Sequence, residues 1–234
     1  MTDYYTSQKV KLLKSFDKLM NKHGKAVLIK QFDDNFAELM IPEIRLQFEK
    51  ILPELPYVGG RKNAYTRIII VNGGIIAVYK VMKEKGKTIE ETLAVACGIS
   101  EKLFESFPKW ILKLGGWFML GPLSRQYLKK QAAQSQKLQY SEDWVYTFVD
   151  SKGKDFDSGL DFSECAVIKL YDKMGLQDLK PYCNFFDVIM GKHMNMGCII
   201  GPHLGSGGEI CSFRYQRGRP TPIPEKLKPF IKAD

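Results

Sequence analysis

The sequence lacks an apolar stretch that is long enough to cross a membrane. The two longest candidates run from Ile68 to Val81 and from Trp110 to Leu123, and both are shorter than the roughly 20 apolar residues that a spanning helix needs. Glycines and lysines interrupt both of them. The first stretch predicts a buried core helix, and the second predicts a loop or a broken helix that lines a pocket or touches a membrane surface. We expect no stable membrane span.

A secretory signal is also missing from the polar amino terminus, because no apolar run leads to a small-residue cleavage site. A cytoplasmic protein is therefore expected. The five cysteines are an odd number and are widely spaced, which is typical of reduced thiols rather than of a disulfide framework.

Paired metal-ligand motifs are absent as well. Structural zinc sites usually carry ligands a few residues apart, and the sequence has no CxxC or HxxxH pair. Cys165, Cys183 and Cys211, with His193 or His203, are the residues that could still enclose zinc. No cofactor is predicted, and a metal-binding protein stays a third hypothesis.

The positive charge does not form a nucleic-acid-binding pattern. The chain has 35 Lys and Arg against 26 Asp and Glu, a formal charge of +9, which favours anionic partners in general. The cations are scattered in small groups, whereas a nucleic-acid binder gathers them on one stripe with aromatic residues. The glycine loop at 205–208 lacks the lysine of a phosphate loop and predicts a hairpin connection.

Hydrophobic periodicity predicts that residues 1–138 form a helical half. Apolar stripes at helical spacing cover 12–20, where His23-Gly24 should end the helix, and 28–52, where Pro42 should kink or restart it. Thr88 and Glu91 have the spacing of a capping box ahead of another helix.

The pattern changes in residues 139–217. Alternating side chains at 144–149 predict a strand, helices should start at Phe162 and Pro181, and two further strands should flank the glycine loop. Residues 218–234 predict a loosely attached tail that is rich in proline and lysine. The expected fold is α+β, with an amino-terminal helical bundle packed on a small antiparallel sheet with two or three helices, as one compact body.

Cys183 is the thiol with the clearest chemical potential. If Pro181 opens a helix, Cys183 lies in its first turn, where free backbone amides and the helix dipole lower a thiol pKa. Asp187, four residues on, would share its helix face and could act as a base. The alternative is that Cys183 is simply a buried core residue, which is common for free cysteines.

Four other side chains accompany this pair. Cys165 lies on the flank of its helix, Cys211 shares a strand face with core aromatics, and His203 stands at a strand end where a general acid or base could operate. Arg214 points to the other strand face and could bind a substrate carboxylate through its guanidinium group. A packing or surface role remains open for each.

These residues together resemble a known family. The run Glu164-Cys165-Ala166, then Met174-Gly175, Leu179, Tyr182-Cys183 with Asp187, Gly205 and Cys211-Ser212-Phe213-Arg214 is similar to the pattern of the L-2-amino-thiazoline-4-carboxylic acid hydrolase family. The likeness extends from about Phe148 to Arg217. Ser212 is a departure, since the family often has an acidic residue at that position.

The resemblance implies hydrolysis of a cyclic amino-thiazoline carboxylate, a small-molecule substrate, to a carbamoyl-cysteine product. Cys183 could attack the ring carbon, or Asp187 could activate water without a covalent intermediate. By the same resemblance, Cys165, Cys211 and Arg214 would contact the substrate. The rival hypothesis is a non-catalytic small-molecule-binding or thiol-sensing module.

Overall fold

The computed structural model describes residues 4–151, 153 and 155–232. It is an α+β fold with one four-stranded antiparallel sheet, as the sequence predicted. The chain divides into two compact units, residues 1–103 and 104–234. The sequence analysis divided the chain after residue 138, so two helices that it assigned to the helical half belong with the sheet. No helix among the described residues has the length and apolarity to span a bilayer.

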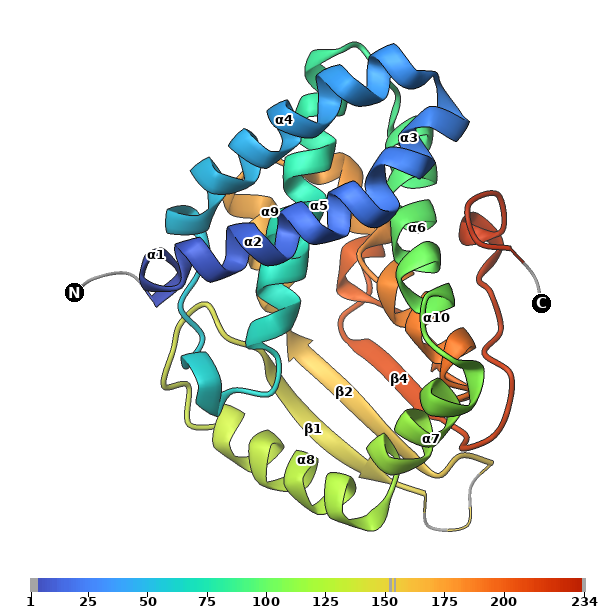
Figure 1. Cartoon of the computed structure of the whole chain (residues 1–234). Helices are drawn as coiled ribbons and strands as arrows, with labels where there is room; N and C mark the ends of the chain where they lie inside the picture. The colour runs from blue at the N-terminus through green and yellow to red at the C-terminus, as the bar shows by residue number, and fades with distance from the viewer. Residues whose placement is uncertain (1–3, 152, 154, 233–234) are drawn as a thin grey trace. The chain divides into compact units, whose positions relative to one another are not determined.

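The first unit consists of helices only (Figure 1). Its elements are α1 (Tyr4–Ser7), α2 (Lys9–Leu19), the π-helix η1 (Met20–Gly24), α3 (Lys25–Gln31), α4 (Asp34–Ile51), the 3-10 helices η2 (Leu52–Glu54) and η3 (Gly60–Lys62), α5 (Thr66–Glu84) and α6 (Ile89–Glu105), which ends two residues past the boundary.

Two helix breaks were placed wrongly from the sequence. Gly24 does not end a helix, because the chain continues from α2 through one π-helical turn into α3. The break comes nine residues later, where Asp33 accepts a hydrogen bond from the Phe36 amide at 2.7 Å and caps α4. Pro42 lies inside α4, which runs on without interruption. Capping chemistry, rather than glycine or proline, therefore sets these boundaries.

The capping box is confirmed. The Glu91 amide donates to Thr88 Oγ1 at 3.2 Å, and the Thr88 amide donates to Glu91 Oε2 at 2.8 Å. The helix that starts there, α6, runs uninterrupted to Glu105. The apolar helix α5 buries most of its residues, as expected of a core helix.

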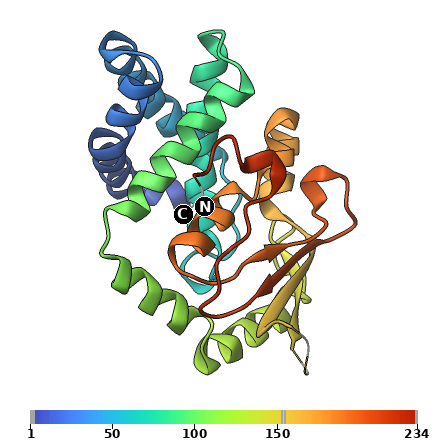
Figure 2. The same ribbon diagram turned by 90° about the vertical axis from the view of Figure 1, so that its right-hand side faces the viewer.

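The second unit carries the sheet (Figure 2). Its elements are α7 (Lys109–Met119), α8 (Pro122–Ser135), β1 (Val145–Asp150), β2 (Ser158–Glu164), α9 (Ala166–Lys173), the 3-10 helix η4 (Gln177–Tyr182), α10 (Phe185–His193), β3 (Ile199–Ile200), the 3-10 helix η5 (Leu204–Ser206), β4 (Cys211–Tyr215) and the 3-10 helix η6 (Glu225–Leu227).

The strand order is β1-β2-β4-β3, and all three pairings are antiparallel. The hairpin of β3 and β4 around the glycine loop was predicted. Strand β2 was missed: the sequence suggested a helix from Phe162, but Leu160 and Phe162 point inward on one face of a strand, and the helix begins only at Ala166. Strand β2 is therefore central in the sheet. It leads directly to Cys165 and pairs with β4, which carries Cys211.

The last segment is packed rather than loosely attached. Leu227 and Ile231 are fully buried, and the Thr221 hydroxyl accepts a hydrogen bond from the Cys198 amide at 2.9 Å. Figures 1 and 2 show this dark red segment running along α10 and β4. It consequently brings Lys226 close to the cysteine-bearing elements.

Candidate functional site: a cluster of thiols, a carboxylate and a lysine–histidine pair

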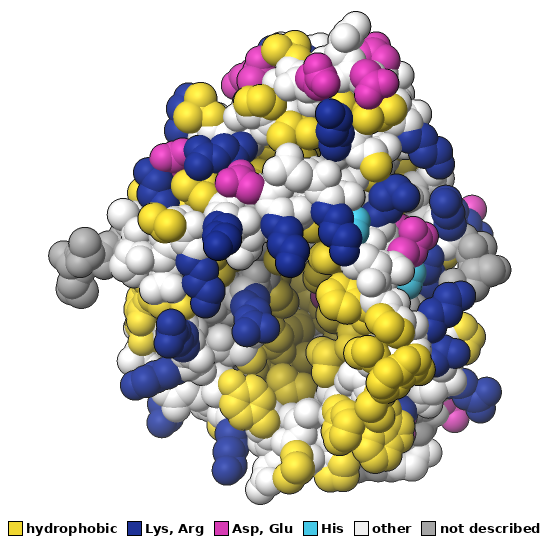
Figure 3. All heavy atoms as spheres, viewed as in Figure 1, with side chains coloured by type: hydrophobic (Ala, Val, Ile, Leu, Met, Phe, Trp, Pro, Cys, Tyr) yellow, Lys and Arg dark blue, Asp and Glu magenta, His cyan; other side chains and the backbone are white. Residues whose placement is uncertain are grey.

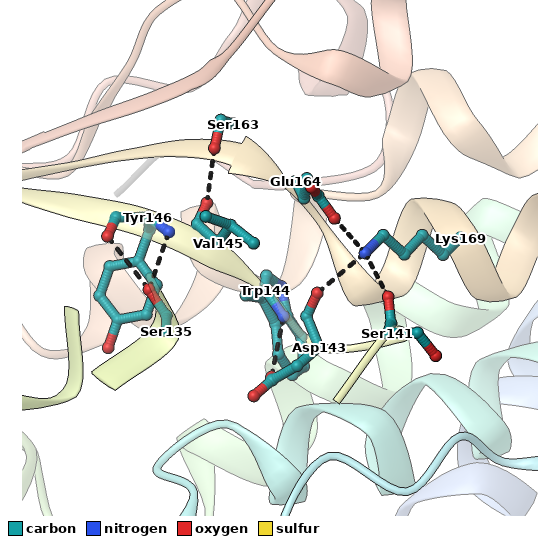
Figure 4. Close-up of polar contacts among 9 residues, drawn as sticks. All are labelled: Ser135, Ser141, Asp143, Trp144, Val145, Tyr146, Ser163, Glu164 and Lys169. Carbon is teal, nitrogen blue, oxygen red and sulfur yellow. Dashed lines mark hydrogen bonds and ion pairs between the residues drawn. The ribbon is translucent and has the colours of Figure 1, made fainter. Parts of the chain in front are cut away.

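Cys165 occupies the residue before the first turn of α9. The backbone amides of Val167 and Ile168 and the Trp144 indole face its sulfur. Lys169 fixes this region, since its amine donates to the carbonyls of Ser141 (2.7 Å) and Asp143 (3.2 Å) and pairs with the Glu164 carboxylate (Figure 4). The thiol at a helix amino terminus is therefore Cys165.

Cys183 occupies a different place from the predicted one. Pro181 lies inside the 3-10 helix η4, Cys183 follows the end of η4, and α10 starts only at Phe185 after Asn184. Cys183 thus lies ahead of the first turn of α10, whereas Asp187 is inside that turn. The prediction that Pro181 opens an α-helix around Cys183 is wrong, because the chain adopts a 3-10 turn first.

Gly205 and Cys211 close the cluster from the β3–β4 connection. The buried sulfur of Cys211 accepts a hydrogen bond from the Leu204 amide at 3.2 Å. At Gly205 a Cβ atom would lie 2.1 Å from the Lys180 carbonyl oxygen and 3.0 Å from Cys183 Sγ. Only glycine allows the glycine loop to approach the end of η4 this closely.

The structure brings together four of the residues that the sequence singled out. Cys183 interacts electrostatically with Cys165, Cys211 and Asp187, and Asp187 also influences Cys211. They come from three separate elements, α9, the η4–α10 segment and β4. The fold therefore builds one cluster from residues that are up to 46 positions apart (211 minus 165).

The thiols of this cluster are not activated. Burial raises the pKa of Cys183 well above its usual value, and the neighbouring thiols Cys165 and Cys211 raise it further. Burial likewise raises the pKa of Cys165 to about 11, although the amides of α9 and the Trp144 indole act in the opposite direction. The expected low-pKa thiolate at Cys183 is thus wrong, because the loss of hydration outweighs every favourable contact.

Asp187 is the group with a pKa near neutrality. Burial raises the pKa of its carboxyl group to about 7, against a weaker opposing effect of its own backbone amide. As a whole residue Asp187 is half-buried, as are Cys183 and Cys165. A carboxyl group that exchanges protons near pH 7 is suited to general acid and base catalysis.

His203 joins the cluster through Cys183, whose sulfur lies 4.0 Å from His203 Nδ1. On the other side of the ring, Nε2 lies 2.6 Å from Lys226 Nζ and 2.8 Å from Ser206 Oγ. A protonated lysine can only donate, so Nε2 accepts and the ring hydrogen is on Nδ1, facing the sulfur. Burial, and then the charge of Lys226, lower the pKa of His203.

Lys226 is the residue of this cluster that the sequence analysis missed. Its amine lies in the cluster, where it also donates to the Pro181 carbonyl and to Ser206 Oγ at 3.3 Å, and its charge opposes the rise of the Cys183 pKa. It belongs to the segment that seemed a loose tail. The one available signal was the pair of apolar residues Leu227 and Ile231, which anchor that segment.

Arg214 does not reach this cluster. Its guanidinium group binds the Asp161 carboxylate through two contacts of 2.6 and 3.1 Å and lies over the Phe156 ring. Successive side chains of β4 point to opposite faces, so Arg214 and Cys211 face different ways. Lys226, rather than Arg214, is the cation beside the thiols.

Within the described part of the chain, no group of three His, Cys, Asp or Glu side chains is arranged to hold a metal ion. Comparison with protein-family models, with curated proteins and with solved structures found no match to this chain.

Proposed function

We propose that this chain is a hydrolase that opens a small cyclic amidine or thiazoline carboxylate, converting an amino-thiazoline carboxylate to a carbamoyl-cysteine. The motif resemblance suggests the substrate class. The observation that carries the proposal is the meeting of Asp187, whose carboxyl pKa is about 7, with Cys165, Cys183 and Cys211 in one cluster. The cluster also contains a cation, Lys226, which favours an anionic ligand.

Asp187 is the proposed acid–base residue. The Cys183 thiol holds its proton at neutral pH because burial raises its pKa. When Lys226 is protonated, the ring hydrogen of His203 is on Nδ1, the atom that faces this sulfur. Nδ1 then has no lone pair with which to accept the thiol proton. Asp187 is then the group of the cluster that can take up and return a proton near pH 7.

The proposed reaction needs one water and no covalent enzyme intermediate. Asp187 takes a proton from water, and the water oxygen adds to the ring carbon that is bonded to one sulfur and two nitrogens. The electron pair of the carbon–nitrogen double bond moves to the ring nitrogen, which takes the remaining proton of the added hydroxyl group as the carbonyl forms. The carbon–sulfur bond breaks, and Asp187 returns its proton to the departing sulfur. The product is a carbamoyl-cysteine, one water heavier than the substrate. Cys183 contacts the ring in this scheme and forms no bond to it.

The alternative is a non-catalytic module that binds a small molecule or senses thiol chemistry. Sensing by oxidation needs a thiolate, and the raised pKa of Cys165, Cys183 and Cys211 works against that version. Binding of a small molecule without turnover is the rival hypothesis, and an experiment must distinguish it from hydrolysis.

The test is incubation of the purified chain with L-2-amino-thiazoline-4-carboxylate, followed by chromatography and mass measurement of the product. The proposal predicts a product one water heavier that carries a free thiol. Asp187→Asn should form none, whereas Asp172→Asn, which alters an exposed carboxylate paired with Lys180, should retain activity. Saturable binding of the substrate with no product over hours would support the rival instead.

A further inference from the structure

Helix α7 presents its large apolar side chains outward. Trp110, Leu114, Trp117 and Phe118 recur at helical spacing and are all exposed, Trp110 by 67%. The exposed apolar side chains continue through Met119 into Leu123 and Tyr127 of α8. Figure 3 shows hydrophobic side chains gathered at the lower right, where α7 lies in Figure 1. We call this surface, from Phe107 to Tyr127, the α7 patch.

The packing of α7 fixes this orientation. Its inward side carries Gly115 and Gly116, and at Gly116 a Cβ atom would lie 2.1 Å from the Met194 carbonyl oxygen at the end of α10. The two glycines let the backbones approach closely. The helix therefore turns its glycines inward and exposes its aromatic residues, the reverse of an ordinary surface helix.

The charges that this segment carries have one sign. Residues 106–141 contain no Asp or Glu and six cations, Lys109, Lys113, Arg125, Lys129, Lys130 and Lys137. Arg125 pairs with Asp157 at 3.6 Å and Lys129 pairs with Asp150 at 2.6 Å, both from other segments. Lys109 and Lys113 lie on α7 itself, and both are exposed. Exposed Trp, Phe and Leu among lysines are the composition of helices that lie in the headgroup region of a bilayer. Two copies of this surface would repel one another, which disfavours self-association.

From this charge complementarity and side-chain composition we infer that the α7 patch docks on the surface of a membrane that contains anionic lipids. The helix lies in the plane of the interface, with Trp110, Trp117 and Phe118 among the headgroups and the lysines on lipid phosphates. This inference is independent of the proposed hydrolase activity.

The experiment measures co-sedimentation of the full chain with vesicles of phosphatidylcholine alone and of phosphatidylcholine with phosphatidylglycerol. We expect binding to the anionic vesicles that weakens with salt, and a blue shift of the tryptophan emission, since two of the three tryptophans lie in the α7 patch and Trp144 is buried. The double change Trp110→Ala with Phe118→Ala should lower the affinity about tenfold.

The charge is tested with a matched pair of variants. Lys109→Glu with Lys113→Glu should lower the affinity by about tenfold or more. Lys11→Glu with Lys14→Glu makes the same change of net charge on exposed positions of α2 and should have a much smaller effect. Substrate turnover in vesicle-free buffer should be the same for all these variants.

Three results would overturn the inference. The first is no binding to anionic vesicles, and the second is equal loss in the two lysine pairs, which would indicate unspecific attraction by the net charge. The third is that the α7 patch binds a different partner. This would be seen as a dimer in solution that Phe118→Ala dissociates, or as tight binding to a single-stranded oligonucleotide without binding to vesicles.

Discussion

Replacing Asp187 by asparagine should stabilise the folded chain at neutral pH, even though it removes the proposed acid–base group. Burial raises the pKa of this carboxyl group to about 7 in the fold, whereas in the unfolded chain it is about 3.9. At a pH between these two pKa values, the Asp187 carboxyl group is ionised in the unfolded chain but protonated in the folded chain. The free energy of unfolding therefore falls as the pH rises through this window, and asparagine avoids the loss.

The size of the effect follows from the difference between the two pKa values. About three pKa units, each worth about 1.36 kcal/mol, set a ceiling of about 4 kcal/mol at pH 8. At pH 5 only about 1.5 kcal/mol of this cost is present. The gain from Asp187→Asn should thus grow by about 2–3 kcal/mol between pH 5 and pH 8, and solvent that reaches the side chain brings the measured value below the ceiling.

Urea unfolding at pH 5 and pH 8, followed by circular dichroism, measures this difference. Asp172→Asn is the control without a pH dependence in this range: hydrogen bonds from Lys180 and Gln177 hold the pKa of Asp172 below its usual value. Its carboxyl group is therefore ionised in both the folded and the unfolded chain at pH 5 and at pH 8, and its replacement should change the free energy of unfolding equally at both. The reasoning is refuted if Asp187→Asn destabilises the chain by the same amount at both pH values, because the carboxylate would then be a structural hydrogen-bond partner.

Three further changes test the cluster. Iodoacetamide should label Cys183 more slowly than free cysteine at pH 7.5 because burial raises the pKa of the thiol; rapid labelling in peptide mass spectra would contradict this. Gly205→Ala should lower the free energy of unfolding by about 1–3 kcal/mol, since its Cβ would lie 2.1 Å from the Lys180 carbonyl oxygen, and an unchanged urea midpoint would argue against the close approach. Lys226→Met should raise the pKa of His203, because the lysine charge now lowers it; an NMR titration that shows no upward shift would exclude the contact.

Local chemistry made much of the fold predictable. The capping box at Thr88 and the hairpin around the glycine loop depend on neighbouring residues, and both occur where the sequence placed them. Strand β2 was missed because one of its two pairing partners, β4, lies far along the chain, so that its central place in the sheet is not a local property of the sequence.

The candidate site divides in the same way. The motif identified Cys165, Cys183, Asp187 and Cys211, which the structure places together. The direction of the Cys183 pKa could not be foreseen, since it depends on burial by distant segments rather than on a helix terminus. Lys226 could not be foreseen either, because its place follows from how the carboxy-terminal segment packs.

The most direct test of the central claim compares Asp187→Asn with Cys183→Ser in the hydrolysis of amino-thiazoline carboxylate. If Asp187 moves the proton and water attacks the ring, Cys183→Ser keeps measurable turnover while Asp187→Asn loses it. If instead Cys183→Ser abolishes turnover and Asp187→Asn retains it, the thiol is the nucleophile and the account given for Asp187 is wrong.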